Sequence, residues 1–168
     1  REIRVETRSG IISLCLRADG LVTVDMGVPE LAPAKIPFLS ASDAVVQPLQ
    51  VGALTLAITA LSMGNPHAVQ VVADVDGAAV AEQGPLIECH ARFPARVDAG
   101  SIQIDGLPVL GVLAFWAGAG ETLACGSGAC AAVVALVRSG RLARQVRVEL
   151  PGGQLQIHWP GDGADVIM

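Results

Sequence analysis

A glycine-rich segment with two cysteines is the part of this sequence most suited to chemistry. Residues 118–130 read GAGETLACGSGAC and lead directly into an apolar run. If that run is a helix, Cys125 lies at its N-terminus, where unpaired N–H groups and the positive end of the helix dipole stabilise an anion. This position favours the thiolate form of Cys125. The same N–H groups, left open by Gly126 and Gly128, can hold a carboxylate or phosphate beside the sulfur.

Other interpretations of this segment predict less chemistry. A glycine-rich turn followed by a buried structural cysteine also explains Cys125, and Cys130, inside the apolar run, is expected to be an inert core residue. A zinc site could add Cys89 and His90 as ligands, but the two cysteines of the segment are too far apart for the short Cys-x-x-Cys pair of structural zinc. We therefore expect no metal. The segment also lacks the third glycine of a dinucleotide motif and the lysine of a P-loop.

A second polar cluster lies between two apolar, strand-like runs. Residues 62–69 read SMGNPHAV and bring an amide, a rigid proline and an imidazole together at Asn65, Pro66 and His67. Catalytic side chains are often mounted on loops at strand ends. An imidazole near a thiol can tune the ionisation of that thiol or accept its proton. A Gly-Asn-Pro turn with an incidental histidine is the alternative interpretation.

The apolar run after Cys125 has to position this chemistry. Residues 128–140 are apolar on every face until Arg138, and a helix without a polar face must be buried on all sides. The run is too short to cross a bilayer and ends at Gly140, a helix stop signal. We therefore predict an α+β fold in which a strongly curved, mixed sheet is rolled around one central buried helix.

The strands of this fold follow from alternation and from turn residues. Apolar or alternating runs predict strands over residues 3–8, 11–17, 21–25, 53–61, 69–75, 101–104, 109–116, 145–150 and 155–159. The turn dipeptides Ser9-Gly10 and Asp19-Gly20 join the first three strands into a meander. Gly152-Gly153 is predicted to be the hairpin turn between the last two strands.

Two short helices are predicted between the strands. Asp76 is expected to cap a helix over residues 78–83, and a second helix is expected over residues 86–91. The pair Gly84-Pro85 should separate them, because proline disrupts the interior of a helix.

A proline-rich segment, residues 27–37, divides the chain. Sheet pairing cannot easily cross several prolines, so we place a domain boundary there. Residues 1–26 then form a three-stranded meander and residues 27–168 a second unit. The strand pattern has already begun at Arg1, so we expect the sequence to be part of a longer chain.

The composition narrows the class of protein. The 168 residues include 11 Lys+Arg and 16 Asp+Glu, giving a net charge of -5, and 52% are hydrophobic. The acidic balance argues against a nucleic-acid partner, and no apolar run reaches the roughly 18 residues of a membrane span. Four cysteines without a leader indicate a reducing, cytoplasmic location. Lys35, the only lysine, lies in an irregular proline-flanked connector, which argues against a pyridoxal phosphate Schiff base.

Taken together, the two polar segments resemble the diaminopimelate epimerase family. The resemblance is carried by MGNPH at 63–67 and by GAGET at 118–122 running into ACGSGACA at 124–131. Shorter segments, VDMG at 24–27, DVD at 74–76 and ELPGG at 149–153, are similar too. The resemblance implies a cofactor-free epimerase that converts LL- to meso-diaminopimelate, a precursor of lysine and peptidoglycan. It also implies two similar halves, each a sheet rolled around a central helix, with one cysteine from each half on opposite faces of the substrate α-carbon. On this resemblance residues 1–26 are a remnant of the N-terminal half, and residues 27–168 are the complete C-terminal half.

The same resemblance implies a role for particular residues. Cys125 is the acid/base of the second half, and Gly126 with Ser127 hold the substrate α-carboxylate. Asn65 is a substrate-binding amide, and His67 modulates the ionisation of the cysteine. The family is often dimeric, so the resemblance leaves a homodimer open, although no interface is identifiable in the sequence.

The chain departs from the family pattern at several positions. The cysteine of the first half is absent, and Cys15, in a strand without glycines, cannot replace it, so we expect the chain alone to be inactive. Trp116 and Ala117 stand where the family usually has Glu-Arg, and Asp98 replaces an asparagine that contacts the distal end of the substrate. A lost carboxylate and guanidinium remove charge-assisted contacts of roughly 1.5–3 kcal/mol each. These departures leave three explanations open: a local sequence error, a divergent substrate and a disabled site.

Two other classes of function therefore stay open. A cysteine hydrolase or acyltransferase would use Cys125 with His67 and the helix N-terminus as an oxyanion hole. A non-catalytic binding module is suggested by Trp116 and Ala117.

Overall fold

The computed structural model describes residues 2–7, 10–104, 109–110, 113–117 and 120–168, and within that part of the chain the strands form three sheets. One is the antiparallel meander β1 (Glu2–Thr7), β2 (Gly10–Leu16) and β3 (Val22–Asp25). The others have the strand orders β10-β9-β7-β6-β5-β4 and β12-β11-β8. Their strands are β4 (Gln47–Val51), β5 (Leu54–Ser62), β6 (Pro66–Val71), β7 (Asp98–Ile102), β8 (Val109–Leu110), β9 (Leu113–Ala117), β10 (Gly120–Thr122), β11 (Gln145–Leu150) and β12 (Gly153–His158).

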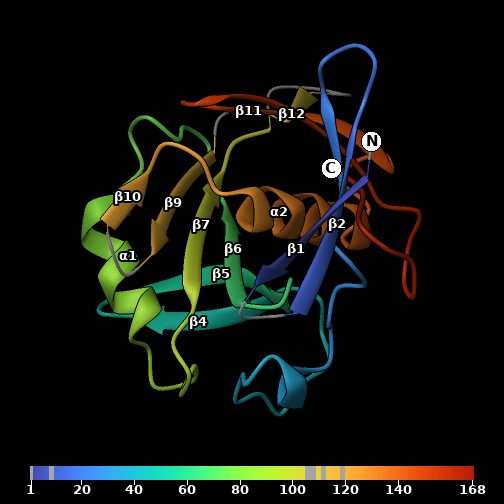
Figure 1. The fold of residues 1–168 in the computed structure, drawn as a ribbon. Helices are drawn as coiled ribbons and strands as arrows, with labels where there is room; N and C mark the ends of the chain where they lie inside the picture. Colours follow the sequence, from blue (N-terminus) through green and yellow to red (C-terminus); the bar gives the residue numbers. More distant parts are fainter. Residues whose placement is uncertain (1, 8–9, 105–108, 111–112, 118–119) are drawn as a thin grey trace.

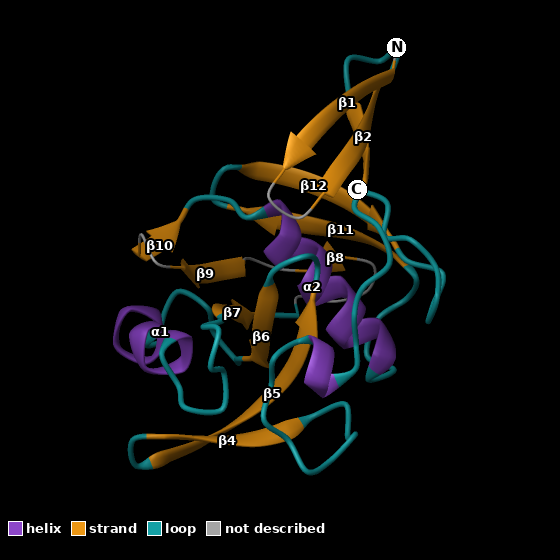
Figure 2. Ribbon diagram, turned by 60° about the horizontal axis from the view of Figure 1, so that its bottom comes forward, coloured by secondary structure: helices purple, strands orange, loops and turns teal. Residues whose placement is uncertain are grey.

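One buried helix, α2 (Gly126–Arg138), runs between the six-stranded sheet and the β12-β11-β8 sheet (Figures 1 and 2). Its residues from 128 to 136 are all buried. The core around it combines Leu61 and Ile102 of the six-stranded sheet with Val148 of β11. The predicted α+β fold, with curved sheets around a central buried helix, is confirmed. The helix begins and ends two residues earlier than predicted.

Gly140 follows the end of this helix and acts as the stop signal that the sequence predicts. Its φ of +71° is a left-handed conformation that glycine adopts without steric cost. The N–H groups of Gly140 and Arg141 donate to the carbonyls of Val137 and Leu136, at 3.0 and 2.9 Å. These bonds satisfy carbonyl groups that the last turn of a helix leaves unpaired.

The opposite face of the six-stranded sheet carries a second core. Here α1 (Val80–Glu88) contributes Ile87, which packs in one cluster with Ile58 of β5 and Ala68 of β6. The short 3₁₀ helix η1 (Pro33–Lys35) lies between β3 and β4 in the chain. Because neighbouring strand residues point to opposite faces, Ala68 joins this cluster while Val69 joins the core around α2.

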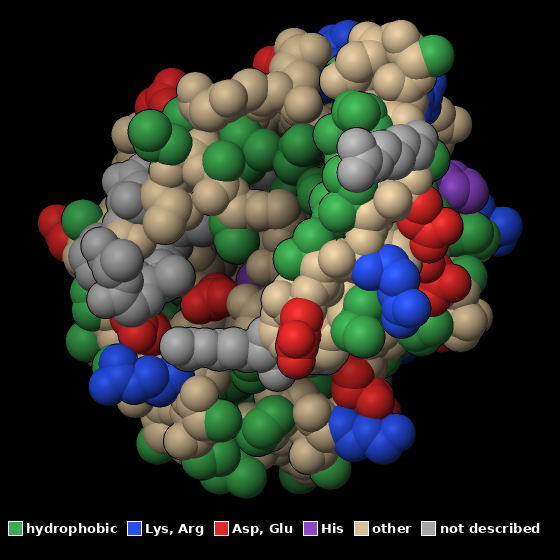
Figure 3. All heavy atoms as spheres, in the orientation of Figure 1, with side chains coloured by type: hydrophobic (Ala, Val, Ile, Leu, Met, Phe, Trp, Pro, Cys, Tyr) green, Lys and Arg blue, Asp and Glu red, His purple; other side chains and the backbone are tan. Residues whose placement is uncertain are grey.

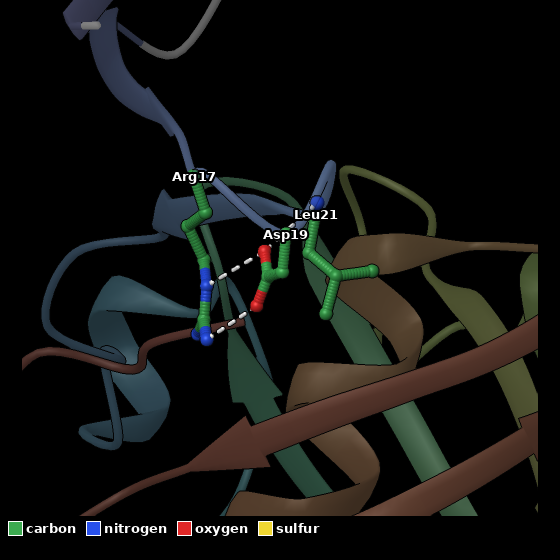
Figure 4. A network of polar contacts seen from close by, with 3 residues as sticks. All are labelled: Arg17, Asp19 and Leu21. Atoms are coloured by element: carbon green, nitrogen blue, oxygen red, sulfur yellow. Dashed lines mark hydrogen bonds and ion pairs between the residues drawn. The ribbon is translucent and has the colours of Figure 1, made fainter.

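The meander is closed at one end by an exposed polar network (Figure 4). Arg17 donates to both carboxylate oxygens of Asp19, at 3.2 and 2.7 Å, and the N–H of Leu21 donates to Asp19 at 3.1 Å. The bond from Leu21, followed by those from Arg17, lowers the pKa of Asp19. Gly20 takes a φ of +83° in this turn, which agrees with the predicted turn dipeptide.

The final residues join the meander to the third sheet. Val24 and Met168 exchange two backbone hydrogen bonds, at 2.7 and 2.9 Å, and His158 and Ile167 exchange two more, at 2.8 and 2.9 Å. The segment therefore lies between β3 and β12. The boundary placed at residues 27–37 stays a prediction.

The two predicted short helices are wrong in one respect, because α1 is a single helix that continues through Gly84 and Pro85. Gly84 has no Cβ, which removes one part of the steric conflict that disfavours the helical conformation before proline. Asp76 is not the cap, since the N-cap is Ala79 without a side-chain hydrogen bond.

The strand predictions hold with shifted bounds. The strand predicted over 69–75 begins earlier and ends at Val71, and the one predicted over 101–104 begins at Asp98. The strand predicted over 109–116 divides into β8 and β9, and residues 111–112 between them lie outside the described residues. Strand β4 was not predicted, because Pro48 interrupts its alternation.

Candidate functional site

Cys125 is the N-cap of the buried helix α2. Its backbone is extended, with φ −141° and ψ 106°, and its Sγ accepts a hydrogen bond from the N–H of Gly128 at 3.3 Å. The Oγ of Ser127 lies 3.5 Å from the same sulfur. The thiol is half-buried, so it is held by the helix terminus and still borders solvent. The predicted placement of Cys125 at the start of a buried helix is confirmed.

The first turn of α2 has the geometry of an anion site. The N–H groups of Gly126 and Ser127 belong to the first turn, where a helix provides no internal acceptor. A methyl group added at Gly126 would approach the Cε of Met168 to 3.3 Å. The C-terminal segment therefore packs beside this turn. No pattern in the sequence around Met168 predicts this contact.

Asn65 and Asp98 meet where β6 and β7 begin. These strands are parallel, and their register pairs His67 with Asp98. The Asn65 Nδ2 donates a hydrogen bond of 2.5 Å to the Asp98 Oδ2. Burial raises the pKa of Asp98, the bond from Asn65 opposes that rise, and the charge of Glu88 adds to it. The structure thus places Asn65, a predicted substrate-binding residue, in a hydrogen bond with Asp98, a position at which the sequence departs from the family pattern.

His67 lies in a different environment. Its side chain is fully buried, and neither ring nitrogen has a hydrogen-bond partner among the described residues. Burial lowers its pKa from 6.5 to about 4, so the ring is neutral near pH 7. The structure therefore does not bring His67 into a hydrogen bond with Cys125, and it leaves the imidazole without the charge that would stabilise a neighbouring thiolate.

The other cysteines differ sharply from Cys125. Cys130 is fully buried in α2, and burial, followed by the charge of Cys125, raises its pKa to about 12. Cys15 and Cys89 are exposed, and all four cysteines are free. Within the described ranges no three His, Cys, Asp or Glu side chains are grouped to hold a metal ion. No helix in the described part of the chain is both long and apolar enough to cross a membrane.

Trp116 and Ala117 lie at the end of β9. Their backbones pair with Glu121 and Gly120 of β10 in an antiparallel ladder, and Trp116 also pairs with Ala99 of β7. β9 and β10 therefore lead the chain towards Cys125. Gly118 and Ala119 of the glycine-rich motif lie outside the described residues.

A cavity borders the polar segment 62–69. It has a volume of about 330 Å³ and lies between the meander and the pair Met63-Gly64. The space-filling view shows the molecule hollowed beside the meander, with hydrophobic side chains along the edge (Figure 3). The segment that holds Asn65 thus starts at a surface depression.

Comparison with solved structures defines the fold class. The chain is similar to a hydroxyproline epimerase from Agrobacterium vitis, with a TM-score of 0.65 and 16% identity, over 99% of this chain and 55% of that one. It is also similar to a PhzF-family phenazine biosynthesis protein from Bacillus anthracis, with a TM-score of 0.59 and 13% identity, over 99% of this chain and 64% of that one. At these identities the likeness shows a shared fold alone.

Sequence comparison gives the family within that fold. The family model for diaminopimelate epimerase matches residues 59–168. Proteins named diaminopimelate epimerase from Azoarcus sp. (strain BH72) and Aromatoleum aromaticum (strain DSM 19018 / LMG 30748 / EbN1) are 65% and 63% identical over all 168 residues. The chain belongs to the diaminopimelate epimerase family. It spans 61% of the length of each of these two relatives.

Proposed function

We propose that this chain carries one half of the active site of an epimerase that inverts the α-carbon of diaminopimelate, with Cys125 as one of its two acid/base groups. The observation that carries the proposal is the Cys125 thiol at the N-cap of a buried helix, in a chain of this family. The Gly128 N–H that points at the sulfur stabilises a thiolate there.

The proposed chemistry is a two-base proton transfer. With the substrate α-carboxylate on the N–H groups of Gly126 and Ser127, a thiolate on one face takes the α-proton, and the C–H electron pair stays on the α-carbon. The thiol on the other face then gives its proton to that carbon, so the configuration inverts. The positive end of the helix stabilises the negative charge that spreads onto the carboxylate. No cofactor is needed in this sequence of steps.

The second thiol has to come from outside these 168 residues. The meander supports this proposal, because it leaves apolar side chains exposed that a soluble domain normally covers. These are Ile3, Val5, Ile11, Leu16, Leu21 and Val22. A groove of about 700 Å³ also lies between β2–β3 and the β11–β12 hairpin. We infer that residues 1–26 pack against the other half of the enzyme, and that the chain alone does not epimerise.

Asn65 and Asp98 are proposed to face the substrate as a pair. Because Asn65 already donates to Asp98, the carboxylate of Asp98 is held beside the amide. A carboxylate favours a substrate group that donates hydrogen bonds, such as an ammonium group. It disfavours a second carboxylate at the same position.

Exchange of the substrate α-proton tests the proposal. The protein extended to the length of its relatives is incubated with diaminopimelate in D₂O, and deuterium at the α-carbon is measured by mass spectrometry. We expect incorporation by the extended protein, none by residues 1–168 alone, and incorporation slowed by at least about 10²-fold in Cys125→Ser. Cys89→Ser, at an exposed position on the chain, is the matched control and should exchange normally. Absence of exchange in the extended protein with Cys125 a free thiol would refute the assignment.

A cysteine hydrolase is less well supported. Such an enzyme needs a base in hydrogen-bond reach of its nucleophile. The buried ring of His67 makes no bond to Cys125. A covalent acyl group trapped on Cys125 would favour this alternative, whereas binding of diaminopimelate without exchange would favour a binding module. The homodimer and the cytoplasmic location stay predictions.

A further inference from the structure

The turn between β11 and β12 lies against the segment that leads into Cys125. The N–H of Gly152 in this turn donates to the carbonyl of Leu123 at 2.9 Å. A Cβ placed on Gly152 would lie 3.2 Å from that carbonyl oxygen and 3.3 Å from the Cβ of Ala124. Both distances are closer than ordinary van der Waals contact, so the two backbones approach to a distance that suits glycine.

The two partners in this contact differ in how firmly they are held. The β11–β12 hairpin is paired along its whole length, and Val146, Val148 and Ile157 are buried against α2. Leu123 and Ala124 are exposed, and the Leu123 residue is 74% exposed. The hairpin is therefore the more firmly held partner in this contact.

We propose that Gly152 is a positioning residue for the Cys125 thiol. By fixing Leu123 and Ala124, it holds Cys125 in the extended conformation in which Sγ receives the Gly128 N–H. The inference rests on the proposed acid/base role of Cys125 for its functional meaning. It assigns a role to the ELPGG segment, which the proposed chemistry does not otherwise use.

Site-resolved alkylation of the folded 168-residue chain tests this role without substrate. Iodoacetamide labelling of Cys125 is followed by peptide mass spectrometry across a range of pH, with the exposed Cys15 and Cys89 as references in the same molecule. In Gly152→Ala we expect the rate of Cys125 alkylation near pH 7 to fall roughly threefold, because the sulfur loses the aligned Gly128 N–H. The profiles of the two reference cysteines should not move.

Two variants separate positioning from general destabilisation. Gly52→Ala strains the β4–β5 turn, where φ is +57° and the added methyl meets nothing, and it should leave the Cys125 profile unchanged. Adding Ala124→Gly to Gly152→Ala removes one of the two close contacts and should move the profile back towards that of the unaltered chain. An unchanged profile in Gly152→Ala, an equal shift in Gly52→Ala, or no recovery in the double variant overturns the proposal.

Hydrogen exchange covers the case in which Gly152→Ala does not fold. In the unaltered chain the Gly152 amide should exchange at least about tenfold more slowly than an unprotected amide of the same sequence context. Rapid exchange of this amide overturns the proposal. Neither measurement depends on epimerase activity, so failure of the positioning role is distinguishable from failure of the proposed function.

Discussion

The two polar motifs of this chain place their Cys125 and His67 side chains in opposite physical environments. The thiol of Cys125 is half-buried and receives a backbone hydrogen bond at a helix N-terminus. The imidazole of His67 is fully buried and has no hydrogen-bond partner among the described residues. A group that must exchange protons with a substrate needs contact with it and a stabilised charged form. The half-buried Cys125 thiol with its backbone donor suits the proposed proton-transfer role, whereas burial of His67 disfavours its charged form.

The largest effect on α-proton exchange should come from substituting Cys125 at the N-terminus of α2. Cys125→Ser in the extended protein replaces the proposed acid/base thiol by a hydroxyl group that hardly ionises near pH 7. We expect α-proton exchange to fall by at least about 10²-fold, the lower range for loss of a general acid or base. Deuterium incorporation measures the loss, and the unfolding temperature should stay near that of the parent protein. Retention of exchange would place the chemistry on another residue.

His67 should affect stability and its pH dependence. Since the folded pKa of about 4 lies below the ordinary 6.5, the unfolded chain takes up a proton in this range and the folded chain does not. The stability contribution is complete above pH 6.5 and is lost as pH falls towards 4, by roughly 3 kcal/mol. Urea unfolding between pH 4 and pH 7 measures this loss.

His67→Leu is the matched variant for that measurement. It replaces the ring by an apolar side chain and removes the titrating group, so its unfolding free energy should depend less on pH by the same amount. Asp98, whose pKa is raised by burial, is present in both proteins, so the difference between the two curves isolates His67. Identical curves would mean that the ring is accessible to protons in the folded chain.

The structure also distinguishes the features that the sequence predicts from those that it does not. The burial of α2 follows from its apolar composition, and the position of Cys125 follows from the glycines around it. The bond from Asn65 to Asp98 depends on the parallel register of β6 and β7, which joins residues far apart in the sequence. The pair Gly84-Pro85 misleads because proline normally ends a helix, whereas a preceding glycine removes one part of the steric conflict.

Substituting Asp98, which lies beside Asn65 where β6 and β7 begin, should have a smaller effect, and that effect should be on KM. Asp98→Asn keeps an oxygen that can accept from Asn65 but removes the negative charge. If diaminopimelate places its distal carboxylate there, KM should fall by about tenfold, equivalent to ~1.4 kcal/mol, while kcat changes little. Asp98→Ala, which also leaves the Asn65 amide without its acceptor, should raise KM. A higher KM in Asp98→Asn would indicate that the carboxylate binds a cationic group of the substrate.

The smallest effect is expected at Ser127, and it bears on how the α2 terminus holds an anion. The hydroxyl lies 3.5 Å from the Cys125 Sγ, a long contact, whereas the backbone N–H groups of the first turn do not depend on the side chain. Ser127→Ala should therefore slow exchange only about twofold to threefold, near 0.5 kcal/mol. Deuterium incorporation at saturating substrate measures it. A loss as large as that of Cys125→Ser would mean that the Ser127 hydroxyl, rather than the helix N-terminus, binds the carboxylate. The α2 terminus would then differ from the His67 site only in its side chains.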